Sequence, residues 1–407
     1  MNILMAHNFY KLAGGEDQCV AAETAMLRAH GHNVIHYCLS NDATDEMGRV
    51  ALASRTIWSR PAFIEMRRLI GSHRPEVVHC HNTFPLISPA AYYAARAEGV
   101  PVVQTLHNFR LVCVNAILLR DGKPCEDCLG AAVPWRGVAR NCYRNSRAAS
   151  AAVATMITAH RLLGTWRNAV GAYIALSEFS RGKFIDGGLP ADKIIVKSNF
   201  LYPDPGEGPG NGGYVAYIGR LSAEKGVETL LSAWRRLGST TPLKIAGDGP
   251  LAPAVQEAAA QNAAIEWLRD VSHEAVYDLI GAAAFLVLPS QCYESAVPRA
   301  AIEGFAKGTP VIVPRLGAMA AIVEDGRNGL RFEPGNPEDL AAKIRRLISD
   351  SSALKRMRRA ARATFDRNFT AEANYEALMA VYARAVDGHS RQGSRKIDAT
   401  TAASDAR

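Results

Sequence analysis

Short apolar runs alternate with longer amphipathic segments along the first half of the chain. Four runs rich in β-branched residues have the length of strands, and the segments at 16–30 and 89–98 have the length and periodicity of helices. The runs cover residues 3–6, 34–37, 77–79 and 102–105. Strands that alternate with helices indicate βαβ units and therefore a parallel sheet.

A segment rich in proline and glycine, residues 203–213, interrupts this alternation. Neither a helix nor a strand continues easily through such a composition, so we predict a linker. The alternation then restarts, with strands expected at 214–218, 243–246, 285–288 and 311–313 and helices at 227–237, 251–261, 274–283 and 299–307.

This pattern predicts an α/β protein with two doubly wound, Rossmann-like domains that face a cleft. The domains cover residues 1–202 and 214–387, and the last helix is expected to pack back on the first domain. Residues 388–407 are polar and without periodicity, so we expect a disordered tail. Ligands of such sheets bind outside the carboxyl ends of the strands.

The distribution of apolar residues also bears on location. No run reaches the roughly 20 uncharged apolar residues of a membrane-spanning helix. The first residues lack the basic stretch and cleavage site of a signal peptide. We therefore expect a cytoplasmic protein whose eight cysteines stay reduced.

Most of the net charge of +8 comes from the first half, where residues 1–200 contain 22 Lys and Arg against 15 Asp and Glu. From Cys128 to Ser177 there is no acid. The arginines of this stretch are Arg136, Arg140, Arg144, Arg147, Arg161 and Arg167. Such a patch suits the phosphates of an anionic lipid surface or of a diphosphate substrate, and solvated helix faces explain it equally well. Because Trp135 and Trp166 lie in the same stretch, we expect peripheral contact with the inner face of a membrane. We expect no nucleic-acid partner.

The second domain contains a charged turn between its first strand and first helix, Gly219-Arg-Leu-Ser-Ala-Glu-Lys-Gly226. Glycine at both ends lets the backbone approach a ligand, and the following helix directs free N–H groups at it. Arg220 and Lys225 add two positive charges. This combination suits a diphosphate, and solvated charges in an ordinary turn are the alternative.

Two carboxylates, Glu294 and Glu303, lie near the start of another predicted helix that follows Pro298. A carboxylate accepts two hydrogen bonds from vicinal hydroxyls, as in ribose recognition. The pair could hold a ribose and a sugar separately, whereas each acid alone also fits an exposed surface.

These segments resemble the family 4 retaining glycosyltransferases of GT-B fold. The resemblance rests on residues 219–226, on Ala-Gly-Asp-Gly-Pro at 246–250, on Pro-Ser…Glu…Glu at 289–303 and on Gly-Thr-Pro-Val-Ile at 308–312. Gly-Gly-Glu at 14–16, His-Cys-His-Asn at 79–82 and Thr-Leu-His-Asn at 105–108 resemble the acceptor domain of the same family.

The resemblance implies transfer of a hexose from a nucleotide-diphosphate sugar to a polysaccharide or lipid-linked saccharide, without a metal cofactor. It implies that Arg220 and Lys225 hold the diphosphate, that Glu303 binds the ribose and that Glu294 and His107 face the sugar. The remaining donor-binding residues would be Gly14, Gly15, Gly219, Ser295 and Ala296. His79 and His81 are weaker candidates.

One spacing departs from the family pattern. Eight residues separate the two glutamates, where the family usually has seven. If the loop before Pro298 absorbs the extra residue, Glu303 keeps its helical position and the role of Glu294 stays open.

Four cysteines cluster in an insertion at about 111–145. Cys125 and Cys128 form a Cys-x-x-Cys pair, and Cys113 and Cys142 flank it. Such spacing is compatible with a structural zinc ion bound by four thiolates. Four reduced cysteines without a metal are the alternative.

Three other classes of function are alternatives to a glycosyltransferase. A dinucleotide-dependent dehydrogenase would need Gly-x-Gly-x-x-Gly directly after the first strand, and no such triplet follows residues 3–6. A nucleotide-sugar epimerase of the same fold and a non-catalytic nucleotide-sugar-binding protein both stay open.

Overall fold

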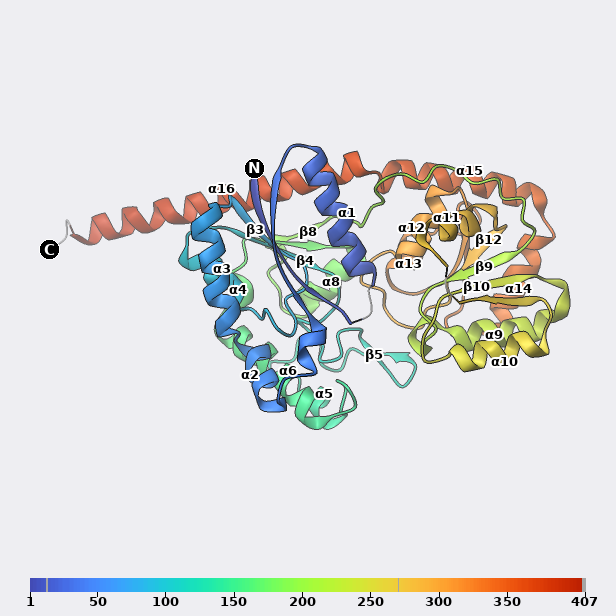
Figure 1. The fold of residues 1–407 in the computed structure, drawn as a ribbon, viewed down its shortest axis with the longest axis horizontal. Helices are drawn as coiled ribbons and strands as arrows, with labels where there is room; N and C mark the ends of the chain where they lie inside the picture. Colours follow the sequence, from blue (N-terminus) through green and yellow to red (C-terminus); the bar gives the residue numbers. More distant parts are fainter. Residues whose placement is uncertain (12–13, 270, 405–407) are drawn as a thin grey trace. The chain divides into compact units, whose positions relative to one another are not determined.

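A computed structural model describes residues 1–11, 14–269 and 271–404, without the side chains of His273 and of residues 391–404 (Figure 1). The chain divides into two compact units. Unit 1 comprises residues 1–116 and 127–197 and the chain from Asn374 onward, and unit 2 comprises 117–126 and 198–373.

Unit 1 contains a six-stranded sheet in the order β2-β1-β3-β4-β7-β8, in which every pair is parallel. The strands are β1 (Asn2–Phe9), β2 (Asn33–Ser40), β3 (Val77–Cys80), β4 (Val102–Leu106), β7 (Ala172–Ala175) and β8 (Ile194–Val196). The direction of winding reverses between β1 and β3, so the loops that follow these two strands flank a topological switch point, where α/β sheets bind ligands.

Helices connect these strands. They are α1 (Gly15–Ala29), α2 (Arg49–Ile57), α3 (Arg60–His73), α4 (Ala90–Ala97), α5 (Trp135–Ala139), α6 (Arg147–Leu162), α7 (Thr165–Asn168) and α8 (Glu178–Asp186), with short 3-10 turns at Asn41–Thr44 and Ala191–Lys193. Side-chain caps fix several of the starts. Ser59 accepts from the backbone N–H of Ala62 at α3, and Ser146 accepts from that of Ala149 at α6.

Unit 2 contains a second six-stranded parallel sheet, in the order β11-β10-β9-β12-β13-β14. Its strands are β9 (Val215–Ile218), β10 (Leu243–Ala246), β11 (Ile265–Leu268), β12 (Phe285–Val287), β13 (Val311–Pro314) and β14 (Gly329–Phe332). This is the order of a dinucleotide-binding Rossmann sheet, with its switch point between β9 and β12. A separate hairpin pairs β5 (Leu119–Arg120) with β6 (Lys123–Pro124).

Two cores cover the two faces of this sheet. Side chains alternate along the strands, so that Tyr217 and Ile245 pack with α9, α10 and α14, whereas Ala216 and Leu286 pack with α11, α12, α13 and α15. The helices are α9 (Val227–Leu237), α10 (Ala252–Gln261), α11 (His273–Ala282), α12 (Arg299–Ala306), α13 (Gly317–Ile322), α14 (Pro337–Ile348) and α15 (Ser351–Asn368), with 3-10 turns at Ala223–Lys225 and Gly238–Thr240. The predicted doubly wound fold class is confirmed.

The segment at 203–213 lies along unit 2. Its backbone N–H groups donate to the carbonyls of Lys307, Gly281 and Ala282 at 2.8–2.9 Å. A Cβ on Gly208 would lie 2.2 Å from the Cα of Gly281. Glycine here therefore permits a close backbone approach, and the composition that predicts a linker corresponds to a strap bound to the unit.

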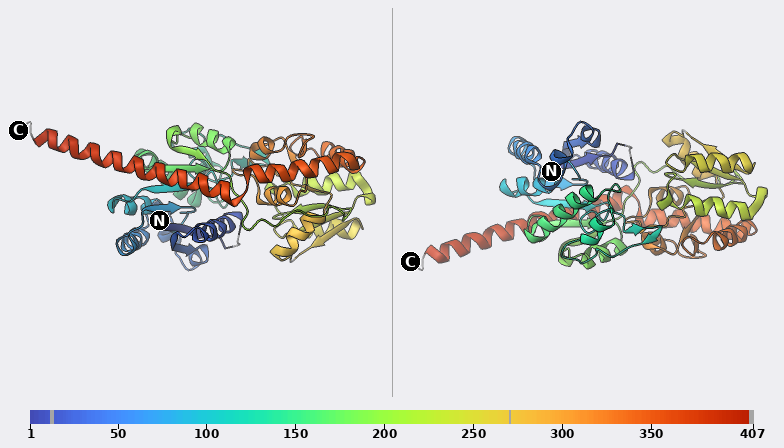
Figure 2. Two further views of the ribbon diagram at one scale, coloured as in Figure 1. Left: turned by 90° about the horizontal axis from the view of Figure 1, so that it is seen from above. Right: turned by 90° about the horizontal axis from the view of Figure 1, so that it is seen from below.

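The last helix, α16 (Ala371–Ser404), belongs to unit 1 from Asn374 onward and packs on it through Leu378, Val381, Tyr382 and Ala385 (red in Figures 1 and 2). The Tyr375 hydroxyl lies 2.8 Å from His32 Nε2, and the Tyr382 hydroxyl lies 2.7 Å from His79 Nδ1. Residues 388–404, expected to be disordered, continue this helix. Extending an existing helix needs no new nucleation, and no proline interrupts the segment.

Candidate functional site

The charged turn of unit 2 follows β9 and leads into α9. Gly226 has φ 72°, in the left-handed region, and directly precedes the helix. A Cβ on this residue would lie 1.9 Å from the backbone oxygen of Pro289. Only glycine therefore allows the turn after β9 to pack against the loop after β12, and the two loops meet at the switch point.

This packing brings together two of the predicted site residues. Lys225 Nζ lies 2.6 Å from Glu294 Oε1, and the Ser290 hydroxyl donates to the same oxygen at 2.8 Å. Burial lowers the pKa of Lys225, but Glu294, Cys292 and Glu224 together outweigh this effect and raise the pKa above its ordinary value. Lys225 is therefore a cation at every physiological pH. Arg220, in the same turn, has an exposed side chain.

Glu303 lies on α12 and is 4% exposed. Arg299, one helical turn earlier, donates through Nε to Glu303 Oε1 at 2.8 Å, and its Nη2 lies 3.4 Å from the Tyr277 hydroxyl. The predicted ribose-binding carboxylate thus has a cationic neighbour that the sequence analysis did not identify. Ser295 and Ala296 are half-buried in the loop between β12 and α12.

Unit 1 gathers four buried histidines at the carboxyl ends of β1, β3 and β4: His7, His79, His81 and His107. His81 Nδ1 lies 2.9 Å from His107 Nε2, and His79 Nε2 lies 2.8 Å from the Thr105 hydroxyl. The predicted His107 and the weaker candidates His79 and His81 therefore form one cluster.

Glu23, on α1, completes this cluster. Its Oε1 lies 3.1 Å from His79 Nδ1 and 3.2 Å from His81 Nε2, and its Oε2 lies 3.1 Å from Lys197 Nζ. Burial raises the pKa of Glu23, but Lys197 and His79 outweigh it and hold the pKa well below its ordinary value. Glu23 is therefore a buried carboxylate paired with a buried ammonium group.

The Gly14-Gly15 segment forms the start of α1. The Gly14 N–H donates to Asp17 Oδ2 at 3.0 Å, and Asp17 Oδ1 lies 2.7 Å from His7 Nε2. Neither glycine has an atom within 4 Å of an added Cβ, so both face open space. Residues 12 and 13, directly before them, lie outside the described part of the chain.

Glu16 is a further acid at this helix start. Asn108 Nδ2 donates to its Oε1 at 2.9 Å, whereas its Oε2 is buried without a hydrogen-bond partner among the described residues. Burial raises the pKa of Glu16 to about 7, although hydrogen bonds from Asn108 and Tyr10 oppose the rise. The carboxyl group therefore changes charge near neutral pH.

In the described part of the chain, no three of the insertion cysteines place their sulfur atoms within 4.8 Å of one another, and the zinc site stays a prediction. Among the described residues, Glu23, His79 and His81 are the set of three whose ligand atoms lie within 4.8 Å of one another. Cys128 and Cys142 both border α5: a Cβ on Gly137 would lie 3.6 Å from Cys128 Sγ, and the Cys142 N–H donates to the Gly137 carbonyl. Cys113 belongs to unit 1 and Cys125 to unit 2.

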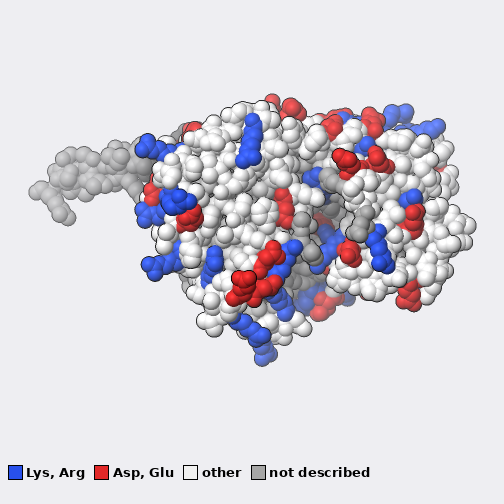
Figure 3. Space-filling model, viewed as in Figure 1, with Lys and Arg blue, Asp and Glu red and all other residues white. Residues whose placement is uncertain are grey.

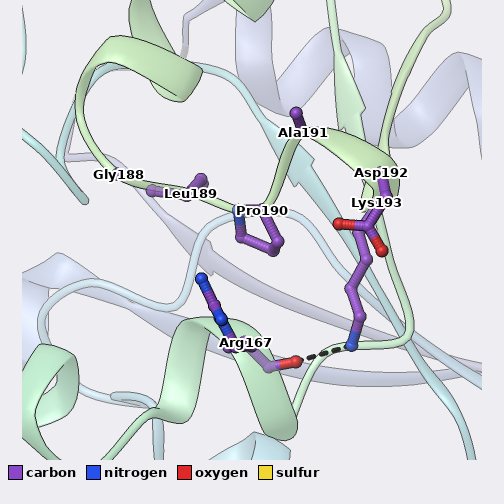
Figure 4. Close-up of a pocket in the computed structure, with 7 residues that line it drawn as sticks. All are labelled: Arg167, Gly188, Leu189, Pro190, Ala191, Asp192 and Lys193. Carbon is purple, nitrogen blue, oxygen red and sulfur yellow. Dashed lines mark hydrogen bonds between the residues drawn. The ribbon is translucent and has the colours of Figure 1, made fainter.

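A pocket of about 420 Å³ in unit 1 is lined by Arg167 and residues 188–193 (Figure 4). Lys193 Nζ closes one side by donating to the Arg167 carbonyl at 2.6 Å. These residues precede β7 and β8, so the pocket lies at the amino ends of the strands. Because α/β sheets bind ligands at the opposite edge, we do not assign the reaction to this pocket.

For four residues of these clusters the sequence analysis predicts no role in the site: Glu16, Glu23, Lys197 and Arg299. A signal existed for Glu23, which lies in α1 three residues after the buried Val20 and three before the buried Met26, on the apolar stripe. Arg299 and Glu303 are four residues apart on a predicted helix, which is the spacing of an ion pair. Lys197 follows a strand that the sequence analysis did not predict.

Two family models match the chain. The model described as Glycosyltransferase Family 4 covers residues 13–204, and the model described as Glycosyl transferases group 1 covers residues 212–350. The two matches together span most of the chain and correspond to the two doubly wound sheets, with β1 alone lying before the first match. The chain therefore belongs to the group 1 glycosyltransferases of family 4.

Curated relatives match shorter stretches. An uncharacterized glycosyltransferase of Methanocaldococcus jannaschii is 32% identical over 39% of this chain and 44% of its own length. A glycogen synthase of Mycobacterium tuberculosis is 33% identical over 42% of each chain. The matched stretch thus spans less than half the length of either relative.

Solved structures match almost the whole chain. A glycosyltransferase from Rickettsia africae has a TM-score of 0.68 at 17% identity, over 95% of this chain and 98% of its own. Anabaena HepE in complex with UDP and glucose has a TM-score of 0.67 at 17% identity, over 94% and 99%. At such identity the likeness establishes the fold, which is GT-B.

The position of Glu16 leads to a pH-dependent stability. The folded carboxyl group binds its proton more tightly than the unfolded one, whose pKa is 4.5. The stabilisation of the folded state by the protonated Glu16 is therefore complete below pH 4.5. About 3 kcal/mol of the free energy of unfolding is lost as the pH rises to about 7. We expect the thermal unfolding midpoint of Glu16→Gln to rise relative to that of the wild type between pH 5 and pH 8.

Glu46→Gln, which changes an exposed acid of the same unit, is the control and should follow the wild type across this range. Parallel midpoints of Glu16→Gln and wild type from pH 5 to 8 would contradict the raised pKa.

Proposed function

We propose that the protein is a retaining glycosyltransferase that moves a hexose from a nucleotide-diphosphate sugar to a saccharide acceptor. The contact of Lys225 with Glu294 at the switch point of unit 2 carries this proposal. A fixed cation beside the free N–H groups of α9 stabilises a diphosphate that gains negative charge as its bond to the sugar breaks. The solved structures of Anabaena HepE with UDP and with UDP-glucose support a nucleotide donor of this kind.

The other residues that we propose to contact the donor lie at the same carboxyl edge of the sheet of unit 2. Glu303, held by Arg299, binds the ribose, and Arg220 extends from the turn toward the diphosphate. Glu294 faces the donor sugar together with Ser295 and Ala296. Gly219 lies at the end of β9 with φ 153°, which allows close approach of its backbone.

Gly14, Gly15 and His107, at the carboxyl edge of the sheet of unit 1, are the remaining residues that contact the donor in this proposal, and the acceptor binds at the same edge. No described side chain is placed clearly as a nucleophile, so attack occurs on the face that the diphosphate leaves. The departing phosphate oxygen then accepts the proton of the acceptor hydroxyl. The protein contributes positioning and charge stabilisation, and no metal or other cofactor takes part in the transfer.

Removal of either cation tests the donor site. Arg220→Ala and Lys225→Ala should each lower turnover by roughly 10²–10³, because a preorganised charge partner of the leaving group is lost. Transfer from a panel of nucleotide sugars, chosen by thermal shift, provides the measurement.

Lys244→Ala is the matched control. Lys244 has the same exposed fraction as Lys225, 32%, and also forms an ion pair, with Glu266 at 3.1 Å, but it lies within β10. It should keep wild-type turnover. Wild-type turnover in both Arg220→Ala and Lys225→Ala would refute the assigned site. Formation of an epimerised nucleotide sugar without an acceptor would favour the epimerase, and tight donor binding without any turnover would favour a non-catalytic binding protein.

A polysaccharide or lipid-linked acceptor at the inner face of a membrane remains part of the proposal. No described helix is both long enough and apolar enough to span a bilayer. Arg136, Arg144, Arg147 and the 61% exposed Trp135 provide basic and aromatic surface on unit 1. On the face drawn in Figure 3, basic and acidic side chains are mixed.

Other side chains of the acid-free stretch 128–177 are less accessible to a bilayer than the sequence suggests. Trp166 is 4% exposed, and Arg161 donates to the carbonyls of Ala131 and Gly187, so neither offers an exposed group to a bilayer. Arg140 pairs with Asp127. Membrane contact therefore depends on the α5 region and on the start of α6.

Binding to vesicles that contain anionic lipid checks this contact. The wild type should bind at low salt and dissociate at high salt, because screening weakens interactions between exposed charges. Arg144→Glu with Arg147→Glu should abolish binding, whereas Arg96→Glu, outside the segment, should not. A wild type that never binds such vesicles would contradict the contact.

The four cysteines remain a predicted structural zinc site, with Cys128 and Cys142 beside α5. Metal analysis of the purified protein should find about one equivalent of zinc, lost in Cys128→Ser and kept in Cys38→Ser. Far less than one equivalent in the wild type would mean that the cysteines are merely reduced.

A further inference from the structure

Two buried polar atoms of the histidine cluster in unit 1 make no hydrogen bond. Glu23 Oε1 and His81 Nε2 have no hydrogen-bond partner among the described residues, and these residues are 1% and 2% exposed. Unpaired polar atoms at such depth are rare in folded proteins, and a bound ion or water molecule commonly accounts for them. The two atoms therefore indicate a group that binds between them.

Three potential ligand atoms meet at this place. Glu23 Oε1 lies 3.1 Å from His79 Nδ1 and 3.2 Å from His81 Nε2, and all three atoms lie within 4.8 Å of one another. Glu23 belongs to α1, His79 belongs to β3, and His81 follows β3 directly. Two imidazoles with one carboxylate form a donor set that suits zinc and neighbouring transition metals.

The distances between these atoms distinguish an ion from a water molecule. A water that bonds to two atoms at about 2.8 Å, in a roughly tetrahedral arrangement, separates them by about 4.5 Å. Two ligands of a transition-metal ion, bound at about 2.0–2.2 Å, lie about 3.0–3.5 Å apart. The observed separations of 3.1 and 3.2 Å fall within the second range. The geometry therefore favours an ion.

Polar partners hold the far side of both histidines. His79 Nε2 lies 2.8 Å from the Thr105 hydroxyl, and His81 Nδ1 lies 2.9 Å from His107 Nε2. A histidine that binds a metal through one ring nitrogen usually hydrogen-bonds through the other, which fixes the orientation of the ring. Both histidines therefore have the surroundings of metal ligands.

Tyr382 supplies a fourth polar atom. Its hydroxyl oxygen lies 2.7 Å from His79 Nδ1, and the residue is 0% exposed. When Nδ1 binds an ion, this hydrogen bond is exchanged for coordination, and the Tyr382 oxygen is close enough to take the fourth position of a tetrahedron. Because Tyr382 lies on α16, the ion would connect this helix to α1 and β3.

Lys197 limits the affinity of such a site. Its Nζ lies 3.1 Å from Glu23 Oε2 and 2.8 Å from Asn374 Oδ1. The ammonium group thus holds one oxygen of the carboxylate while the other faces the histidines, and it repels a metal ion. We therefore expect the site to take up zinc that is added, rather than to keep zinc through purification.

We propose that Glu23, His79 and His81 bind a divalent transition-metal ion, with zinc as the first candidate, and that Tyr382 completes its coordination. None of these residues is more than 2% exposed, so the ion has no position open to a substrate. It is a structural ion that joins α1, β3 and α16 and takes no part in the transfer. This site does not rest on the proposed function.

Zinc binding is measured in the full-length variant Cys125→Ser with Cys128→Ser, which lacks two ligands of the predicted cysteine site. The protein is stripped of metal with a chelator and dialysed against Zn²⁺. We expect about one bound equivalent, with nitrogen and oxygen neighbours at about 2.0–2.2 Å by zinc X-ray absorption. No bound zinc, or zinc with mainly sulfur neighbours at about 2.3 Å, would overturn the proposal.

The wild type gives a measurement that does not depend on the folding of this variant. After the same treatment its zinc should have nitrogen and oxygen neighbours in addition to any sulfur neighbours. Sulfur neighbours alone would contradict the site.

His81→Gln and His160→Gln are a matched pair. Each replaces a buried histidine of unit 1, and His160, which is 1% exposed, contacts the Thr165 hydroxyl and the Ile57 carbonyl instead of Glu23. His81→Gln should lose the added zinc and the rise in thermal unfolding midpoint that zinc causes by mass action, whereas His160→Gln should keep both. Equal uptake of zinc by the two variants would overturn the assignment.

Lys197→Met tests the competition for Glu23. The zinc affinity of this variant should rise by at least about tenfold, because the repulsion between the ammonium group and the ion is removed. Glu23 then depends on zinc for an opposite charge, so added zinc should raise the thermal unfolding midpoint more than in the wild type. A destabilised variant that zinc does not restore would show that Glu23 serves Lys197 alone, and the proposed ion would be wrong.

Discussion

The contact between the loops after β9 and β12 is the constraint on which the donor site of unit 2 depends. The strand order reverses between these two strands, so the helices that follow them, α9 and α12, lie on opposite faces of the sheet. This arrangement leaves the carboxyl edge between the two strands accessible to a ligand. The backbone oxygen of Pro289 occupies the place where Gly226 would carry a side chain. The approach positions Lys225 beside Glu294 and fixes both at the start of α9. A cation at a helix N-terminus thereby meets a carboxylate that lies 69 residues away in the sequence.

Unit 1 solves a different electrostatic problem. A carboxylate as buried as Glu23 is costly unless an opposite charge compensates it. The Lys197 ammonium group supplies that charge, and His79 and His81 lie 3.1 and 3.2 Å from the other carboxylate oxygen. The same groups connect α16 to the sheet through Asn374 and Tyr382. The network therefore has a structural role, because it ties the last helix to the core of unit 1.

Several expectations about the surface changed because exposure depends on tertiary packing. Trp166 follows a helix whose sequence looks amphipathic, but its ring is buried between Tyr92 and His160. The strap at 203–213 is rich in glycine, yet its backbone is bound to unit 2. In both cases composition describes the residues correctly and cannot show which neighbour covers them.

The sequence by itself determined the two parallel-sheet folds and the position of most strands, because β-branched runs and amphipathic segments record local burial. It also determined the charged turn at Gly219 to Gly226, whose glycines and cations are adjacent in the chain. A run of four residues gives no dependable distinction between a strand and a loop, so that of the strands of this length β9 and β10 were predicted whereas β7 and β11 were not. The tertiary structure alone decided that Lys225 meets Glu294, 69 residues away, and that Glu23 meets Lys197, 174 residues away. Such pairs follow from strand order and loop packing, which local patterns do not encode.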